Sequence, residues 1–165
     1  MTKAKEFKVG DKAVYPAHGV GEITDIMIRK LGGQERQFYT LKVLENGMKI
    51  MVPVATATAA GLRPIVSAKE ARDVFDVLKS DDVAVKTQPW NRRYREYMDM
   101  LKSGSPFEVA KVLRDLYRLK FEKELSFGER RLLDTANTLL IVELSLALET
   151  AEDDVKKQVE EIFVS

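Results

Sequence analysis

The stretch from Gln37 to Val54 reads QFYTLKVLENGMKIMVPV, and its pattern decides the fold of the first part of the chain. Apolar and polar residues alternate on both sides of Asn46-Gly47, which is typical of two half-buried antiparallel strands joined by a tight turn. Both residues of an Asn-Gly pair tolerate positive φ, so a two-residue type I′ turn is predicted. The stretch therefore predicts a β-hairpin.

A two-residue turn also predicts which side chains share a face of this hairpin. The face expected in the core carries three cross-strand pairs: Val43 with Ile50, Leu41 with Val52, and Tyr39 with Val54. The opposite face carries Phe38, Thr40, Lys42, Lys49, Met51 and Pro53. Pro53 cannot donate a ladder hydrogen bond, which favours an edge strand, and an outward Met51 beside it favours a partner that binds this edge. A loop such as residues 55–61 covering these side chains is the alternative interpretation.

The period of the apolar pattern changes near residue 65. Before this point the chain alternates with period two, whereas beyond it apolar residues recur about every 3.6 residues, as in helices. Three Ser-x-x-Glu motifs predict helix starts. They are Ser67 with Glu70, Ser105 with Glu108, and Ser126 with Glu129. The sequence predicts an α+β protein of two domains, 1–65 in β-strands and 66–165 in about five helices, with the helix around residues 132–148 at the centre.

Composition argues against several classes of function. The 165 residues include no cysteine, which leaves no disulfide, thiolate zinc site or thiol nucleophile. No apolar run reaches the roughly 18 residues that a membrane span requires, and the start lacks a signal-peptide pattern, so we expect a cytoplasmic protein that does not bind membranes. The single histidine, His18, lies in a turn-like stretch and is interpreted as structural. Since no phosphate-binding glycine motif or metal cluster is found, we expect no enzyme activity, no cofactor and no metal.

Charge is unevenly distributed along the chain although the net charge is only +1. Residues 86–120 contain nine basic against four acidic residues, a net of +5. Residues 143–161 contain seven acidic against two basic residues, a net of −5. A local basic excess of this kind indicates an anionic partner.

Residues 87–97 read TQPWNRRYREY and contain the only tryptophan, Trp90, at an expected helix start. Arg92, Arg93 and Arg95 follow it. Positive charges near a helix N-terminus oppose the macrodipole, so helix formation does not explain them. Contacts of the arginines with DNA phosphates, with Trp90 entering the minor groove, would explain them. In the alternative interpretation Trp90 fills the core and the arginines pair with nearby acids.

Six motifs follow one another along nearly the whole chain. They are FKVGDKAVYP at 7–16, HGVG at 18–21, MVP at 51–53, WNRRY at 90–94, VLRDL at 112–116 and LSFGERRLL at 125–133. In these motifs the chain resembles the CarD/CdnL family of bacterial transcription regulators. The resemblance implies a Tudor-like small β-barrel that binds the RNA polymerase β subunit, and a compact helical domain that binds promoter DNA near the upstream edge of the −10 element. It further implies stabilisation of the open complex by a tryptophan in the minor groove.

The resemblance also implies roles for single residues. The DNA-contacting positions of the family are matched by Trp90, Arg92, Arg93, Arg95 and Arg130. The polymerase-contacting positions are matched by Arg29, Met51 and Pro53, of which Met51 departs from members that carry arginine there. We expect a monomer that associates with the nucleoid through RNA polymerase. The rival hypotheses are a Tudor-like adaptor whose helical domain binds another protein, and a subunit or regulator of an enzyme.

Overall fold

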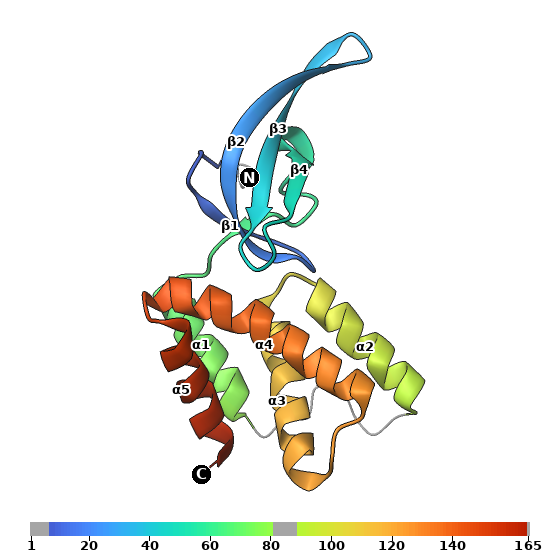
Figure 1. Ribbon diagram of the computed structural model, residues 1–165, viewed down its shortest axis with the longest axis vertical. Coiled ribbons are helices and arrows are strands. Elements are labelled where there is room, and N and C mark those ends of the chain that lie inside the picture. The colour runs from blue at the N-terminus through green and yellow to red at the C-terminus, as the bar shows by residue number, and fades with distance from the viewer. Residues whose placement is uncertain (1–6, 81–88, 165) are drawn as a thin grey trace. The chain divides into compact units, whose positions relative to one another are not determined.

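The computed structural model describes residues 7–80 and 89–164 of the chain. It divides the chain into two compact units, Met1–Ile65 and Val66–Ser165, each with its own hydrophobic core. The first unit is built on a five-stranded antiparallel sheet and the second on five helices (Figure 1). The predicted α+β fold class is confirmed.

The sheet of the first unit has the strand order β4-β3-β2-β1-β5. Its strands are β1 (Lys12–Tyr15), β2 (Gly19–Leu31), β3 (Gln34–Val43), β4 (Lys49–Pro53) and β5 (Arg63–Pro64), and a short 3₁₀ helix η1 (Val54–Thr56) follows β4. Neighbouring strands are antiparallel. Strand β4 is an edge of this sheet, as predicted from Pro53, which cannot donate to a further strand.

The predicted hairpin forms between β3 and β4, but its turn and register differ from the prediction. Leu41 lies opposite Ile50, two residues away from the predicted pairing. In the loop at 44–47, Gly47 has φ 72° whereas Asn46 does not adopt positive φ, and the Asn46 side-chain oxygen accepts a hydrogen bond from the amide of Met48 (2.9 Å). The asparagine thus stabilises a wider loop instead of a two-residue turn. Because the shift is even, every side chain keeps its predicted face.

The inward face of the hairpin forms much of the core of the first unit, as predicted. Its buried members are Tyr39, Leu41, Val43 and Val52, with Ile50 and Val54 partly buried. On the outward face Thr40 is buried, which was not predicted. Met51 is 41% exposed and Pro53 is exposed, so the alternative in which residues 55–61 cover these two side chains is wrong.

Gly21 in β2 lies where a side chain has no room. A Cβ atom at this position would lie 2.7 Å from Cδ1 of Leu41 and 2.9 Å from the carbonyl oxygen of Lys42. We expect Gly21→Ala to lower the free energy of unfolding of the first unit by about 1–3 kcal/mol, the usual cost of overpacking. Calorimetry of the full chain measures this change, with Gln37→Ala at an exposed site of β3 as the control. An unchanged transition for Gly21→Ala would contradict the packing described here.

Strands β2 and β3 continue beyond their neighbours as a hairpin arm, defined here as residues 28–37. All residues of the arm are exposed, and its tip is Gly32-Gly33 with φ 58° and 80°. Positive φ at both residues gives the turn that matches the strand twist. Strand β1 pairs with β2 only at residues 19–22 and β4 pairs with β3 only at 38–42, so both backbone edges of the arm are open within the described part of the unit (Figure 1).

Within residues 66–80 and 89–164 the second unit contains five helices, the number that was predicted. They are α1 (Ala68–Lys79), α2 (Trp90–Lys102), α3 (Pro106–Glu122), α4 (Phe127–Leu148) and α5 (Glu152–Val164). Helix α4 contacts each of the other four, so it is the central helix of the unit, as predicted. Its buried side includes Leu132, Leu133, Ala136, Leu140 and Leu144.

Serine side chains begin three of these helices, as predicted. Ser67 and Ser126 form complete capping boxes, in which the serine accepts from a backbone amide and the glutamate three residues later accepts from the serine amide. At α3 only half of the box forms. Ser105 accepts from the amide of Glu108 (3.4 Å), whereas the Glu108 carboxylate pairs with Lys111 (3.0 Å). The neighbouring lysine therefore replaces the serine amide as the partner of this glutamate.

Candidate nucleic-acid interface

Helix α2 begins differently from the three serine-capped helices. Its N-cap is Pro89, which makes no side-chain cap, and its first turn has no acidic residue. The amides of Arg92 and Arg93 both donate to the Pro89 carbonyl oxygen (3.1 Å each). The positive end of the helix dipole is thus not offset by a capping side chain or an acid of its own first turn, which favours an anionic partner. Trp90 is the first residue of α2, and its side chain lies outside the part of the structure that is described.

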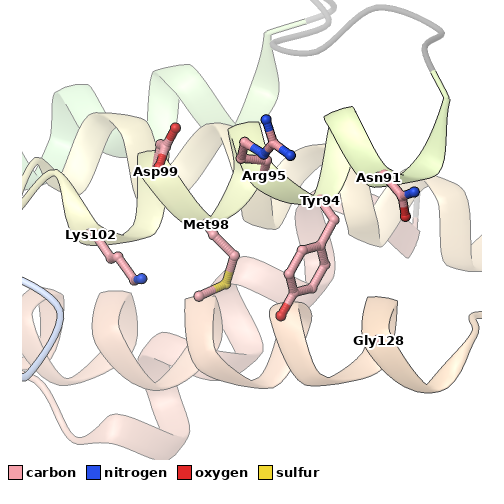
Figure 2. A pocket seen from close by; sticks show the side chains of 7 residues that line it. All are labelled: Asn91, Tyr94, Arg95, Met98, Asp99, Lys102 and Gly128. Carbon is pink, nitrogen blue, oxygen red and sulfur yellow. The ribbon is translucent and has the colours of Figure 1, made fainter.

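Helices α2 and α4 lie side by side with their N-termini at the same end (Figures 1 and 2). An ion pair between Arg93 Nη2 and Glu129 Oε2 (3.4 Å) connects the two first turns. The structure therefore brings the arginines that follow Trp90 close to Arg130, although 35 or more residues of sequence separate them. The N-termini of α2 and α4 thus lie near Arg92, Arg93, Arg95 and Arg130. These two helix ends and four arginines are called the α2–α4 surface.

The arginines of this surface have different environments. Arg92, Arg95 and Arg130 are exposed, and none of them makes an ion pair within residues 7–80 and 89–164. Arg93 is half-buried and pairs with Glu129. The alternative in which the arginines pair with acids therefore holds for Arg93 but is wrong for Arg92 and Arg95.

An open groove of about 550 Å³ runs between α2 and the start of α4 (Figure 2). It is lined by Asn91, Tyr94, Arg95, Met98, Asp99, Lys102 and Gly128. Figure 2 shows the side chains of Tyr94 and Met98 directed toward α4, while Arg95 and Asp99 lie on the far side of α2. The lining combines apolar side chains and two cations, Arg95 and Lys102, with one acid, Asp99. Apolar and cationic side chains together suit contact with the sugars and phosphates of a nucleic acid.

Glu129 is a buried acid beneath the α2–α4 surface. Its Oε1 accepts from the amide of Ser126 (2.9 Å) and lies 3.5 Å from Nζ of Lys123, while its Oε2 pairs with Arg93. Burial alone would raise the pKa of Glu129, but the Ser126 hydrogen bonds and the charges of Lys123 and Arg93 outweigh it and lower this pKa below its ordinary value. The carboxylate is therefore ionised at neutral pH.

The outward face of the first unit carries the other three predicted residues. Phe38 lies opposite Pro53, and Thr40 lies opposite Met51 in the next row along the same face. Two residues along β3 from Phe38, in the direction away from Thr40, Arg36 lies opposite Arg29 of β2. Because alternate residues of a strand share a face, Arg29, Met51 and Pro53 all point outward from one side of the sheet. The structure therefore brings these three residues together.

The described residues contain no cluster of metal-binding side chains. Within residues 7–80 and 89–164, no group of three or more His, Cys, Asp or Glu side chains could hold a metal ion. The ring of His18 stacks on Tyr15 with their centroids 5.6 Å apart, in the turn between β1 and β2. Among the described helices, none combines the length and the apolar character needed to cross a bilayer.

Family models match both units of the chain. The model described as "CarD-like/TRCF RID domain" matches residues 7–66, and the model described as "CarD, C-terminal domain" matches residues 73–160. The chain belongs to the CarD/CdnL family. This confirms the resemblance found in the sequence, and it places the chain among transcription factors with a Tudor-like β domain followed by a helical domain.

A relative and a solved structure are also similar to this CarD/CdnL chain. The "Putative transcription factor YdeB" of Bacillus subtilis (strain 168) is 33% identical over 153 residues, which are 91% of this chain and 97% of the relative. The structure "CdnLNt from Myxoccoccus xanthus" is 48% identical and covers 41% of this chain and 94% of that one, with a TM-score of 0.33.

The family motif at 112–116 has a structural function in the helical unit. Arg114 is 1% exposed, and its Nη1 donates to the carbonyl oxygen of Val77 (3.2 Å) at the end of α1. Arg118, one turn further on, donates to the carbonyl oxygen of Ser80. Part of the basic excess counted in residues 86–120 thus stabilises the fold and is not available to a partner. Sequence counting could not separate buried from exposed arginines.

The same motif attaches α2 to α3. Asp115 Oδ1 lies 3.3 Å from Nε of Arg114, and Asp115 Oδ2 accepts a hydrogen bond from the hydroxyl of Tyr97 (3.4 Å). Burial, together with the charge of Asp115, raises the pKa of Tyr97 far above its ordinary value. The tyrosine therefore keeps its proton, and α2 is held on α3 through a neutral hydroxyl donor.

Sequence reasoning missed several residues of the α2–α4 surface. Phe127 is 71% exposed, and the guanidinium of Arg131 lies 5.8 Å from the centre of its ring. Lys123 is half-exposed next to Glu129, and Tyr94 is 40% exposed. An exposed aromatic ring among cations can stack on a base or a sugar. For Phe127 the only signal in the sequence was the family motif LSFGERRLL, because spacing alone does not distinguish an exposed phenylalanine from a core residue.

Proposed function

We propose that this CarD/CdnL protein stabilises the open promoter complex by binding RNA polymerase and promoter DNA at the same time. The α2–α4 surface binds DNA near the upstream edge of the −10 element, and the outward face of the sheet binds the polymerase β subunit. One observation carries the DNA part: Arg92, Arg95 and Arg130 are exposed around an α2 start that has no capping side chain. The protein acts as a monomer, in the cytoplasm and at the nucleoid.

On the DNA side, Arg92, Arg93, Arg95 and Arg130 contact phosphates and Trp90 enters the minor groove. Arginines bind phosphates through two parallel hydrogen bonds, which fixes the position of α2 on the backbone. Inserting an apolar side chain costs a few kcal/mol of unstacking per step, and this cost is lower where the duplex has begun to open. Trp90 thus binds the opened geometry more tightly than the closed one and shifts the equilibrium toward it. Sequence readout is slight because the minor groove separates mainly A·T from G·C pairs.

On the polymerase side, Arg29, Met51 and Pro53 contact the β subunit. Their support is the shared face of the sheet, the edge position of β4 and the match to a CarD-like/TRCF RID domain. Few cations face the DNA, so binding to DNA alone is weak and depends on salt. Attachment to the polymerase supplies the local concentration that compensates for this weakness.

The lifetime of the open complex at a ribosomal-type promoter tests the proposal directly. We expect saturating protein to lengthen this lifetime, because a ligand that binds only the opened state lowers its free energy. The measurement is the decay of purified polymerase complexes after a competitor is added, with and without the protein. If polymerase retains the protein while the lifetime stays the same, the proposed function is wrong.

The adaptor hypothesis keeps one observation in its favour. Phe127 is 71% exposed, and a protein partner could cover it as well as a nucleic acid could. An adaptor of this kind would show no salt-dependent binding to fork-junction DNA, whereas the proposed function requires such binding. Titration of labelled fork-junction DNA with the full chain separates the two hypotheses.

A further inference from the structure

Three charged side chains meet beneath the α2–α4 surface. The Glu129 carboxylate is 1% exposed, and it lies within 3.5 Å of both the Lys123 ammonium and the Arg93 guanidinium. Arg93 comes from α2, whereas Lys123 lies between α3 and α4. The side chains of Arg93 and Lys123 are 23% and 52% exposed, so both cations reach the solvent side of this cluster.

The capping box of α1 shows what a capping glutamate needs. Glu70 forms the same box with Ser67 through its Oε1, and it is exposed. Glu129 also uses Oε1 for the amide of Ser126, but its Oε2 pairs with Arg93 from another helix. A helix cap requires only the first of these contacts. The contact between Glu129 Oε2 and Arg93 is therefore not needed to cap α4.

We propose that Glu129 is an internal counter-charge that limits the affinity of the α2–α4 surface for DNA. The inference rests on the proposed DNA binding and concerns how that binding is regulated. The carboxylate competes with DNA phosphates for Arg93 and Lys123, and its negative charge lowers the positive potential of the α2–α4 surface. A buried charge is screened by salt much less than an exposed one, so this competition persists at physiological ionic strength.

Low intrinsic affinity has a consequence for where the protein binds. A surface that used all its cations would bind duplex DNA anywhere, because phosphate contacts carry no sequence information. With Arg93 and Lys123 engaged by Glu129, the surface binds DNA firmly only when attachment to polymerase raises its local concentration. Glu129 therefore directs the protein to polymerase-bound promoters.

The substitution Glu129→Gln in the full chain tests this proposal. Glutamine keeps the oxygen that accepts from the Ser126 amide but removes the charge. We expect tighter binding to a labelled fork-junction duplex, by up to roughly eightfold at 0.1 M salt, and a salt slope steeper by about 0.9 for each additional phosphate that the surface neutralises. Fluorescence anisotropy over a range of salt concentrations measures both. The matched control is Glu70→Gln, which makes the same change in the other capping box and should leave DNA binding unchanged.

A double-mutant cycle tests the specific link to Arg93. In the natural sequence Arg93→Gln should weaken DNA binding less than Arg92→Gln does, because Glu129 already engages the Arg93 charge. In the Glu129→Gln background Arg93→Gln should weaken binding as much as Arg92→Gln. Additive effects of the two substitutions would overturn the proposal, since coupling is what the cycle detects.

The outcomes distinguish a failure of this inference from a failure of the proposed function. Suppose that the chain binds DNA and that Arg92→Gln weakens this binding, but Glu129→Gln does not tighten it. The proposed role of Glu129 is then wrong, whereas the proposed DNA binding is supported. If the natural chain shows no salt-dependent DNA binding, both are wrong. If circular dichroism shows that Glu129→Gln unfolds the helical unit, the single substitutions test the proposal instead. The proposal is then wrong if Arg93→Gln weakens DNA binding as much as Arg92→Gln does.

Discussion

Replacing Trp90 with alanine is expected to shorten the open-complex lifetime almost to the value measured without the protein. Stacking of an aromatic side chain on a base contributes about 1–3 kcal/mol, so we expect a loss of at least about fivefold in lifetime. Alanine is the best helix former, and Trp90 is the first residue of α2, so the helix should still begin at this position. The measurement is the decay of competitor-challenged complexes at saturating concentrations of the variant.

Two controls accompany the Trp90→Ala experiment. Trp90→Phe keeps an aromatic ring and should retain part of the effect, whereas loss through misfolding would not depend on the ring. Binding of Trp90→Ala to free polymerase should equal that of the natural chain, because the first unit is unchanged. A variant that folds, binds polymerase and still gives the full lifetime would disprove the minor-groove role of Trp90.

Met51→Asp is expected to prevent retention of the protein by RNA polymerase. Met51 is 41% exposed on the outward face, and it shares edge strand β4 with Pro53. An unpaired carboxylate buried in an interface is costly, and substitutions at central interface residues commonly remove about 2 kcal/mol or more, roughly 30-fold in affinity. Binding of the full chain to immobilised polymerase measures the loss.

The control for Met51→Asp is the same change on the other face. Ile28 is 62% exposed and lies opposite Gln37, on the side of the hairpin arm away from Arg29. Ile28→Asp should leave polymerase binding intact, and neither substitution should change binding to fork-junction DNA. If Met51→Asp instead reduced DNA binding and left polymerase retention unaffected, the two surfaces would have been assigned the wrong way round.

For the β3–β4 hairpin, the sequence was sufficient to predict which face of each strand is buried, but not how the residues of the two strands pair. Alternation of apolar residues fixed which side of the β3–β4 hairpin is buried, and this held because an even shift preserves the face. The register depended on whether Asn46 would adopt positive φ or use its side chain to accept from the Met48 amide, and it did the latter. Asparagine favours both conformations, so its identity alone does not choose between them.

The candidate site was predictable where residues are close in sequence. The segment at 90–95 showed an aromatic residue and arginines at a helix start, and the family motifs added Arg130. The pairing of Arg93 with Glu129 was not predictable, because it depends on how α2 packs against α4. The burial of Arg114 could not be predicted for the same reason, because the carbonyl group that it binds belongs to Val77 on another helix.

The hairpin arm has a consequence for the behaviour of the protein in concentrated solution. Its open backbone edges could pair with the arm of a second molecule and begin edge-to-edge stacking, the first step of aggregation. The arm carries Arg29, Lys30 and Arg36 against a single acid, Glu35, so two arms that approach each other repel. This repulsion weakens as salt screens it. Arg29, which we propose to contact the polymerase, therefore also opposes self-association of the arm.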